Sequence, residues 1–166
     1  MALLRMPLVA AGTRSANRDG MKVSQMGDSN DLRDLVEELQ REIDRKEETE
    51  YSGRMLEEYR DPQNVGRMHN PDAYGIVTGS CGDVMEIFLR FRGIVITEVC
   101  FMTNGCGATL ACGSAITRMA YGRTASEAAL ISAQDLLTEL EGLPEENRHC
   151  ATLAVDTLHA ALADLK

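Results

Sequence analysis

Two alternating segments joined by a tight turn constrain the fold of this chain most strongly. From Val84 to Phe91 apolar and polar side chains largely alternate, and Ile94 to Met102 is rich in β-branched residues and alternates again. A period of two is typical of strands with one buried face, and Arg92-Gly93 between the segments is typical of a hairpin turn. We therefore expect an antiparallel hairpin, with Gly75 to Thr78 as a third strand.

Helical segments follow the predicted strands, beginning with the alanine-rich stretch from Cys106 to Tyr121. Helix ends are marked by capping or stop signals, which fall at Gly122, Thr124 with Glu127, Ser132 with Asp135, Gly142, and Pro144 as the opening residue of the last helix. Strands followed by helices are typical of an α+β fold. We expect a two-layer sandwich in which helices cover a small antiparallel sheet of about three strands.

The N-terminal part has a different composition. From Asp28 to Glu50 the chain is densely charged, with apolar residues spaced three and four apart at Leu32, Leu35, Val36, Leu39 and Ile43. This spacing predicts an amphipathic helix, which would cover a core edge or contact a partner such as a second copy of the chain. A short helix from Tyr51 to Tyr59 should end before Pro62. The predicted organisation is a disordered tail (1–30), an acidic helical extension (31–50) and one globular domain (51–166).

Composition excludes several classes of function. The net charge of -9 argues against binding to nucleic acid or an anionic membrane surface, and no apolar run approaches the roughly 20 residues that span a bilayer. The five cysteines are an odd number without paired spacings, so reduced thiols in a cytoplasmic location are expected. The first 22 residues carry four basic residues and one acid, but they lack the sustained amphipathic period of an organellar presequence.

Three cysteines lie where predicted loops meet regular elements. Glycines flank Cys81 and Cys106, which keeps bulk away from both thiols. Cys106 also stands at a predicted helix start, where free N–H groups stabilise a thiolate. Cys150 follows His149, and Asp83 lies two residues after Cys81. Such donors suit zinc, ferrous iron or an iron–sulfur cluster.

Packing is the competing interpretation of the same residues. Scattered ligands do not by themselves prove a metal site, and Cys106 and Cys150 would then be small buried side chains, with Asp83 a cap at the strand end. Cys100 and Cys112 have no glycines on both sides and no polar partner nearby in sequence. We interpret both as packing residues.

Several short motifs occur in a fixed order from about Tyr51 to the C-terminus: Asp61-Pro62-Gln63-Asn64-Val65-Gly66, Pro71-Asp72-Ala73-Tyr74-Gly75, Gly79-Ser80-Cys81-Gly82-Asp83-Val84-Met85, Gly105-Cys106-Gly107-Ala108, and Leu143-Pro144 followed by His149-Cys150. In these motifs the chain resembles the IscU/NifU family of iron–sulfur cluster assembly scaffolds. The resemblance implies a non-enzymatic scaffold that receives sulfur from a cysteine desulfurase, assembles a [2Fe–2S] cluster from that sulfur and iron, and transfers the cluster to apo-proteins.

The resemblance also implies the site. Cys81, Cys106 and Cys150 would be cluster ligands, with Asp83 and His149 the candidates for the remaining position, and zinc an alternative occupant when no cluster is bound. We expect Cys150 to accept the sulfur, because it follows the stretch from Glu141 to Asn147, which we expect to be flexible. The chain departs from the family pattern at Asn147, where members served by a dedicated chaperone carry a lysine. Arg148 is the candidate for supplying that positive charge.

Two alternatives belong to other classes of function. Related sulfur-relay proteins hold zinc with the same kinds of ligand, but they carry an insertion between the second and third cysteines, for which Gly122 to Pro144 leaves no room. A thiol enzyme would use Cys150 as nucleophile and His149 as base. Adjacent side chains on a helix point about 100° apart, so we expect these two not to share a hydrogen bond.

Overall fold

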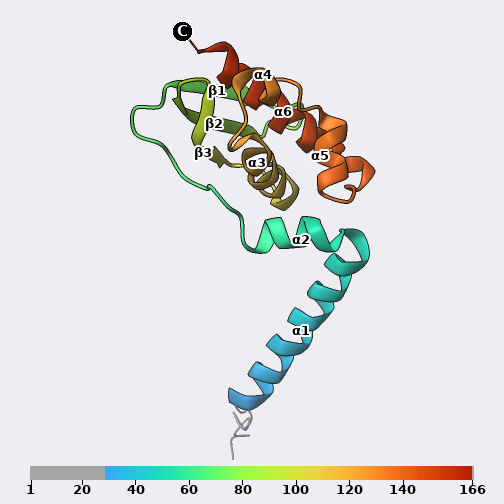
Figure 1. Ribbon diagram of the computed structural model, residues 1–166. Coiled ribbons are helices and arrows are strands. Elements are labelled where there is room, and N and C mark those ends of the chain that lie inside the picture. The colour runs from blue at the N-terminus through green and yellow to red at the C-terminus, as the bar shows by residue number, and fades with distance from the viewer. Residues whose placement is uncertain (1–28, 166) are drawn as a thin grey trace, which may run out of the picture. The chain divides into compact units, whose positions relative to one another are not determined.

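The computed structural model describes residues 29–165 and contains a three-stranded antiparallel sheet in the order β1-β2-β3 (Figure 1). The strands are β1 (Ala73–Thr78), β2 (Val84–Arg92) and β3 (Val95–Thr103). Gly75 of β1 pairs with Ile87, and Ile87 pairs with Phe101 of β3. Helices lie against this sheet, so the predicted α+β architecture is confirmed.

The hairpin turn lies one residue later than the sequence suggested. Arg92 still pairs with Val95, which leaves Gly93-Ile94 as the turn. Gly93 has φ +63°, a left-handed conformation that glycine adopts without the steric cost borne by other residues. The prediction that Arg92-Gly93 forms the turn, with Ile94 opening the next strand, was therefore wrong. A change of register between Arg90 and Phe91 marks a bulge near this end of the hairpin.

One face of the sheet packs on helices α3 (Gly107–Ala120) and α6 (Arg148–Ala163). The inward side chains of β2, Met85, Ile87 and Leu89, have no exposed surface. Gly75 lies so close to α6 that an added Cβ would stand 2.3 Å from the backbone nitrogen of Ala161. No side chain fits there, so this glycine sets how closely β1 and α6 approach.

The remaining elements on this side are α4 (Ala125–Ala128), α5 (Ala133–Glu139) and the 3₁₀ turn η1 (Glu145–Asn147). Thr124 with Glu127 and Ser132 with Asp135 form both expected capping boxes. Gly122 has φ +77° after α3, as expected for a C-cap glycine. Pro144 does not open the last helix directly: it precedes the 3₁₀ turn, and α6 begins at Arg148.

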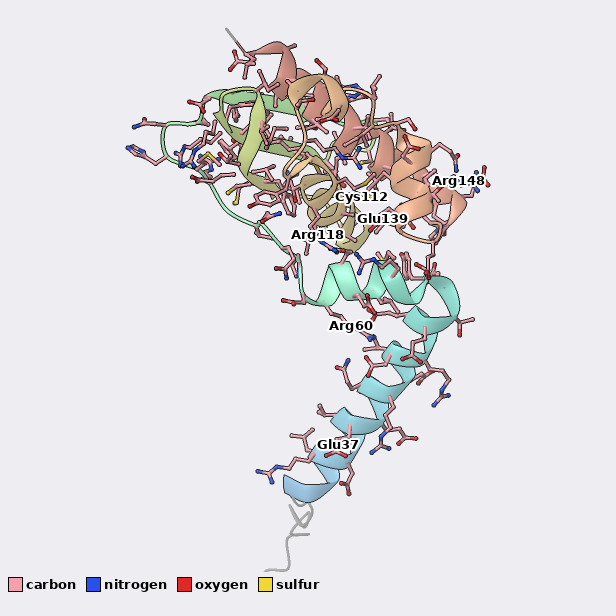
Figure 2. All side chains as sticks on the ribbon, viewed as in Figure 1. Glu37, Arg60, Cys112, Arg118, Glu139 and Arg148 are labelled. Carbon is pink, nitrogen blue, oxygen red and sulfur yellow. The ribbon has the colours of Figure 1, made fainter. Side chains whose placement is uncertain are left out.

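Helix α2 (Gly53–Arg60) lies beside α3 and ends before Pro62, as predicted. It buries Met55 and Leu56 in the core, together with the charged side chain of Glu58. Ser114 donates a hydrogen bond to Glu58 at 2.5 Å, and Arg54 and Arg118 form ion pairs with the same carboxylate. Arg118 lies on the part of α3 nearest to α2 (Figure 2). A buried carboxylate is tolerated only when paired in this way.

Helix α1 spans Ser29–Glu50, which confirms the predicted amphipathic helix. The chain divides after Glu38 into two units. The apolar stripe from Leu32 to Ile43 is exposed, with each side chain at least 50% accessible. Nearly all of the predicted tail, residues 1–28, lies outside the described residues. Within residues 29–165, no helix is long and apolar enough to cross a membrane.

Candidate metal centre

The loop between β1 and β2 carries the first predicted ligand. The Gly79 N–H donates to the Asp83 carbonyl at 2.7 Å, and the Gly82 N–H donates to the Gly79 carbonyl at 3.1 Å. Gly82 has φ +90°, so the tight loop depends on a conformation that favours glycine. This geometry leaves Cys81 exposed. The half-buried Asp83 follows in the same loop, immediately before β2.

Cys106 is the N-cap residue of α3 and is exposed. Partial burial raises the pKa of its thiol, but hydrogen bonds from the Thr109 hydroxyl and from the backbone N–H groups of Thr109 and Ala108 outweigh this effect, so the pKa lies below its usual value. The thiolate expected at this helix start is therefore favoured by the structure. A cavity of about 220 Å³ lies beside Cys106 and is also lined by Tyr51 and Tyr59.

Cys150 lies in the first turn of α6 and is fully buried. Burial raises the pKa of this thiol to about 11, an effect partly opposed by the hydrogen bond from Thr109 and reinforced by the negative charges of Cys106 and Cys81. At neutral pH Cys150 therefore keeps its proton.

The expectation that His149 and Cys150 do not share a hydrogen bond was wrong. The Nε2 atom of His149 lies 3.7 Å from the Cys150 sulfur, within hydrogen-bonding distance for sulfur. This contact does not create an activated nucleophile, since Cys150 is inaccessible and its pKa is raised. The thiol-enzyme alternative therefore fails on burial and acidity, although the geometric argument against it does not hold.

Thr109 joins the predicted ligands, and sequence reasoning did not identify it. Its hydroxyl donates to Asp83 Oδ2 at 2.9 Å and lies 3.3 Å from the sulfur of Cys150 and 3.6 Å from the sulfur of Cys106. The residue has no exposed surface. Its position three residues after Cys106, on the same face of α3, was the one signal in the sequence.

The ligands predicted from the sequence thus gather at one end of the domain. Asp83, Cys106 and Cys150 meet at the Thr109 hydroxyl, His149 touches Cys150, and Cys81 is close enough for its charge to raise the pKa of Cys150. They do not converge on a single point: among the described residues no group of three or more His, Cys, Asp or Glu side chains is placed to hold one metal ion.

The other two cysteines lie elsewhere in the packing. Cys112 is fully buried within α3 (Figure 2), and burial raises its pKa above the usual range. Cys100 on β3 is half-buried, and burial followed by the charge of Glu98 raises its pKa. Both positions fit the packing role expected from the sequence, and all five cysteines are free thiols.

The positive charge expected near Asn147 is directed outward. Asn147 accepts a long hydrogen bond of 3.4 Å from the Tyr51 hydroxyl. Arg148 is exposed, lies at the outside of the domain (Figure 2) and is 4.0 Å from Glu145. In this arrangement Arg148 does not approach the sulfur atoms.

Comparisons with known proteins identify the family of this chain. Residues 50–166 match the family described as NifU-like N terminal domain. The chain is 38% identical over 122 residues to the iron-sulfur cluster assembly scaffold protein IscU of Buchnera aphidicola, a match that covers 70% of this chain and 94% of that protein. It is 37% identical to the Escherichia coli protein of the same name (70% and 94%) and 36% identical to IscU 1 of Archaeoglobus fulgidus (69% and 75%).

Solved structures with a similar fold include a nitrogen-fixing NifU-like N-terminal protein from Brucella abortus, with a TM-score of 0.55, 25% identity, and 69% of this chain and 92% of that chain covered. A second is a putative iron-sulfur cluster assembly scaffold protein for the SUF system from Fervidobacterium islandicum, with a TM-score of 0.60 and 21% identity over 69% and 97% of the two chains. The second likeness supports the fold alone.

Proposed function

This chain belongs to the family of NifU-like N-terminal domains, and on that premise we propose that it is a non-enzymatic scaffold for the assembly of iron–sulfur clusters. The observation that carries the proposal is the meeting of Asp83, Cys106 and Cys150 at one buried hydroxyl, with Cys81 on the loop beside them. Relatives that share most of their length with this chain are named as such scaffolds.

The cargo of the proposed scaffold is a [2Fe–2S] cluster built from iron and sulfide. Cys81, Cys106 and Cys150 would supply three thiolates, with Asp83 or His149 in the fourth position. Soft sulfur donors with one harder oxygen or nitrogen suit iron and zinc alike. Among residues 29–165 these side chains do not converge on one point, so assembly requires the ligands to shift toward one another.

Anaerobic reconstitution tests the function directly. The purified chain is incubated with ferric iron and sulfide, then desalted and examined by visible absorption and by iron and sulfide analysis. Two irons and two sulfides per cluster, with the charge-transfer bands of a thiolate-bound cluster, are the expected result. A chain that retains only zinc under these conditions would support the zinc-containing sulfur relay instead, a reading that the scaffold names of the relatives do not favour.

Cys150 remains our proposed acceptor of sulfur from a cysteine desulfurase. Its thiol is buried and its pKa is raised, so the residues that cover it must move before a desulfurase can reach it. Peptide-resolved mass spectrometry after incubation with desulfurase and cysteine should show the extra sulfur on Cys150. Label confined to Cys81 or to the exposed Cys106 would contradict the assignment.

Further partners are apo-proteins that receive the cluster and, through α1, a second copy of the chain. The exposed stripe from Leu32 to Ile43 supports such a self-contact. Comparison of the mass in solution with that of a Leu39→Glu/Ile43→Glu variant tests it, and an unchanged monomer for both would reject it. A cytoplasmic location is also part of the proposal, supported by bacterial and archaeal relatives.

A further inference from the structure

Thr109 uses its hydroxyl differently from the other buried helical threonines. Thr157 on α6 donates to the Leu153 carbonyl four residues earlier at 2.6 Å, and Thr117 on α3 donates to the Gly113 carbonyl at 2.9 Å. That local bond is the usual one for a threonine inside a helix. Thr109 instead directs its hydroxyl out of its own helix, toward Asp83 in the loop before β2 and toward the sulfur of Cys150. Its role is therefore tied to the site rather than to its own helix.

The surrounding backbone holds Asp83 ready for this bond. Val84, the next residue, donates its N–H to the Asn104 side chain at 2.7 Å, and its carbonyl accepts from the Thr103 hydroxyl at 2.7 Å. An added Cβ at Gly105 would stand 2.6 Å from Asp83 Oδ2 and 2.6 Å from the Thr109 Cβ. Gly105 thus leaves the space in which the carboxylate and the hydroxyl meet.

The geometry points to Thr109 as a positioning residue for metal binding, acting through Asp83 and Cys150, and this inference rests on the proposed scaffold function. The hydroxyl engages Oδ2 and leaves Oδ1 of Asp83 without a described hydrogen bond, so the carboxylate is oriented while one oxygen stays available to a cation. Within residues 29–165 the Thr109 hydroxyl is the hydrogen-bond donor that fixes this carboxylate. Hydrogen-bond partners of metal ligands typically change metal affinity about 10–100-fold.

Cobalt(II) is the probe that tests this inference, because its visible bands and sulfur charge-transfer absorption report both binding and thiolate ligation. Thr109→Val keeps the shape and removes the hydroxyl. We expect Co²⁺ to bind this variant about tenfold or more weakly than wild type, with a smaller sulfur charge-transfer intensity at saturation. Thr109→Ser should restore both.

Thr157→Val is the matched control, since it removes a buried helical hydroxyl that serves only its own helix. This variant should bind Co²⁺ like wild type. Thermal melts measured in parallel show whether it has lost stability, and a loss of stability alone should not change the affinity for Co²⁺. In a double-mutant cycle, Thr109→Val should add little to Asp83→Ala if the hydroxyl acts through that carboxylate. If the effects of Thr109→Val and Asp83→Ala on Co²⁺ affinity are additive, the hydroxyl acts only through the thiols. That result would overturn the role assigned to Asp83.

The outcomes separate the inference from the function it rests on. Wild-type affinity in Thr109→Val, or a wild-type chain that does not bind Co²⁺, would overturn the positioning role. If wild type binds Co²⁺ and Thr109→Val weakens it, but no cluster forms on reconstitution, the positioning role stands and the scaffold function fails.

Discussion

The helices that carry the candidate cysteine ligands and the helices that carry none of them begin differently. Helices α2, α4 and α5 are capped by the side chains of Ser52, Thr124 and Ser132. Helices α3 and α6, which deliver Cys106 and Cys150, have no side-chain cap hydrogen bond among the described residues. Where the chain needs only stability, a hydroxyl satisfies the first N–H groups. At the start of α3 the N–H groups of Ala108 and Thr109 donate to the sulfur of Cys106 instead, and at the start of α6 the Arg148 N–H donates to the Glu145 carbonyl of the preceding 3₁₀ turn.

The two uncapped starts also differ from each other. Cys106 is exposed, and hydrogen bonds lower its pKa despite partial burial, whereas burial raises the pKa of Cys150 to about 11. Both lie at a positive helix end, so the helix dipole alone does not decide which thiol ionises. Burial and the number of hydrogen bonds to the sulfur decide it.

The largest expected effect is the loss of cluster binding on mutating Cys106, compared with mutating a cysteine further along the same helix. Cys106→Ala should abolish stable cluster binding, because the thiolate favoured by hydrogen bonding at the start of α3 is lost. Cys112→Ser, in the core of α3, should leave the reconstituted cluster in place, at some cost in stability. Visible absorption and iron content after reconstitution measure both variants. A cluster that survives Cys106→Ala and is lost in Cys112→Ser would reverse our ligand assignment.

The contrast between the two helix starts predicts unequal thiol reactivity. With a pKa of about 11, roughly one Cys150 in a thousand is ionised at pH 8, whereas Cys106 ionises more readily than an ordinary cysteine. Iodoacetamide should therefore modify Cys106 about 100-fold faster or more. Peptide-resolved mass spectrometry over a time course gives both rates. Comparable rates would mean that Cys150 is not held in its buried, protonated form.

The same contrast predicts a loss of stability at alkaline pH. The folded state keeps the Cys150 proton up to about pH 11, while the unfolded chain releases it near its usual pKa of 9. The stabilisation is thus complete below pH 9 and is lost as the pH rises from 9 to 11, at a cost of about 2 kcal/mol. Urea unfolding of wild type and Cys150→Ala at pH 8.5 and 11 should show a steeper fall for wild type. Parallel pH dependences would contradict the raised pKa.

The smallest expected effect concerns a capped helix remote from the centre. Ser132→Ala removes the hydroxyl that accepts from the Asp135 N–H at 3.2 Å, and should lower the free energy of unfolding by about 1 kcal/mol. Cluster assembly should be unchanged. If the variant instead loses its cluster while staying folded, the division between stabilising starts and ligand-binding starts is not valid.

Local signals made most of the fold predictable. Alternation identified β2 and β3, and the Ser-x-x-Asp and Thr-x-x-Glu patterns identified two helix starts that form as expected. The predicted boundaries were wrong where contacts with neighbouring residues determine where an element begins or ends. The hairpin turn lies one residue later than predicted because Arg92 pairs with Val95. Helix α6 begins later than predicted because the chain forms a 3₁₀ turn after Pro144.

The sequence predicted the candidate cysteines, but it did not predict the threonine that lies between them. The neighbouring glycines and the family resemblance identified Cys81, Cys106 and Cys150 as candidate ligands. Thr109 was not found, because its partner Asp83 lies 26 residues away in sequence and only its spacing of three residues from Cys106 distinguishes it from a packing threonine. The burial of Cys150 was also not evident from a sequence that placed it at a helix start.

The close approach of Gly75 to Ala161 has a consequence for biosynthesis. One face of β1 is completed by a helix whose contacting residue follows 86 positions later in the chain. At about 5–20 residues per second, a ribosome needs roughly 4–17 s to synthesise that stretch, and during this time the nascent sheet lacks its cover. Cys150 belongs to the same late helix. The proposed set of cluster ligands is therefore complete only after translation has passed this helix.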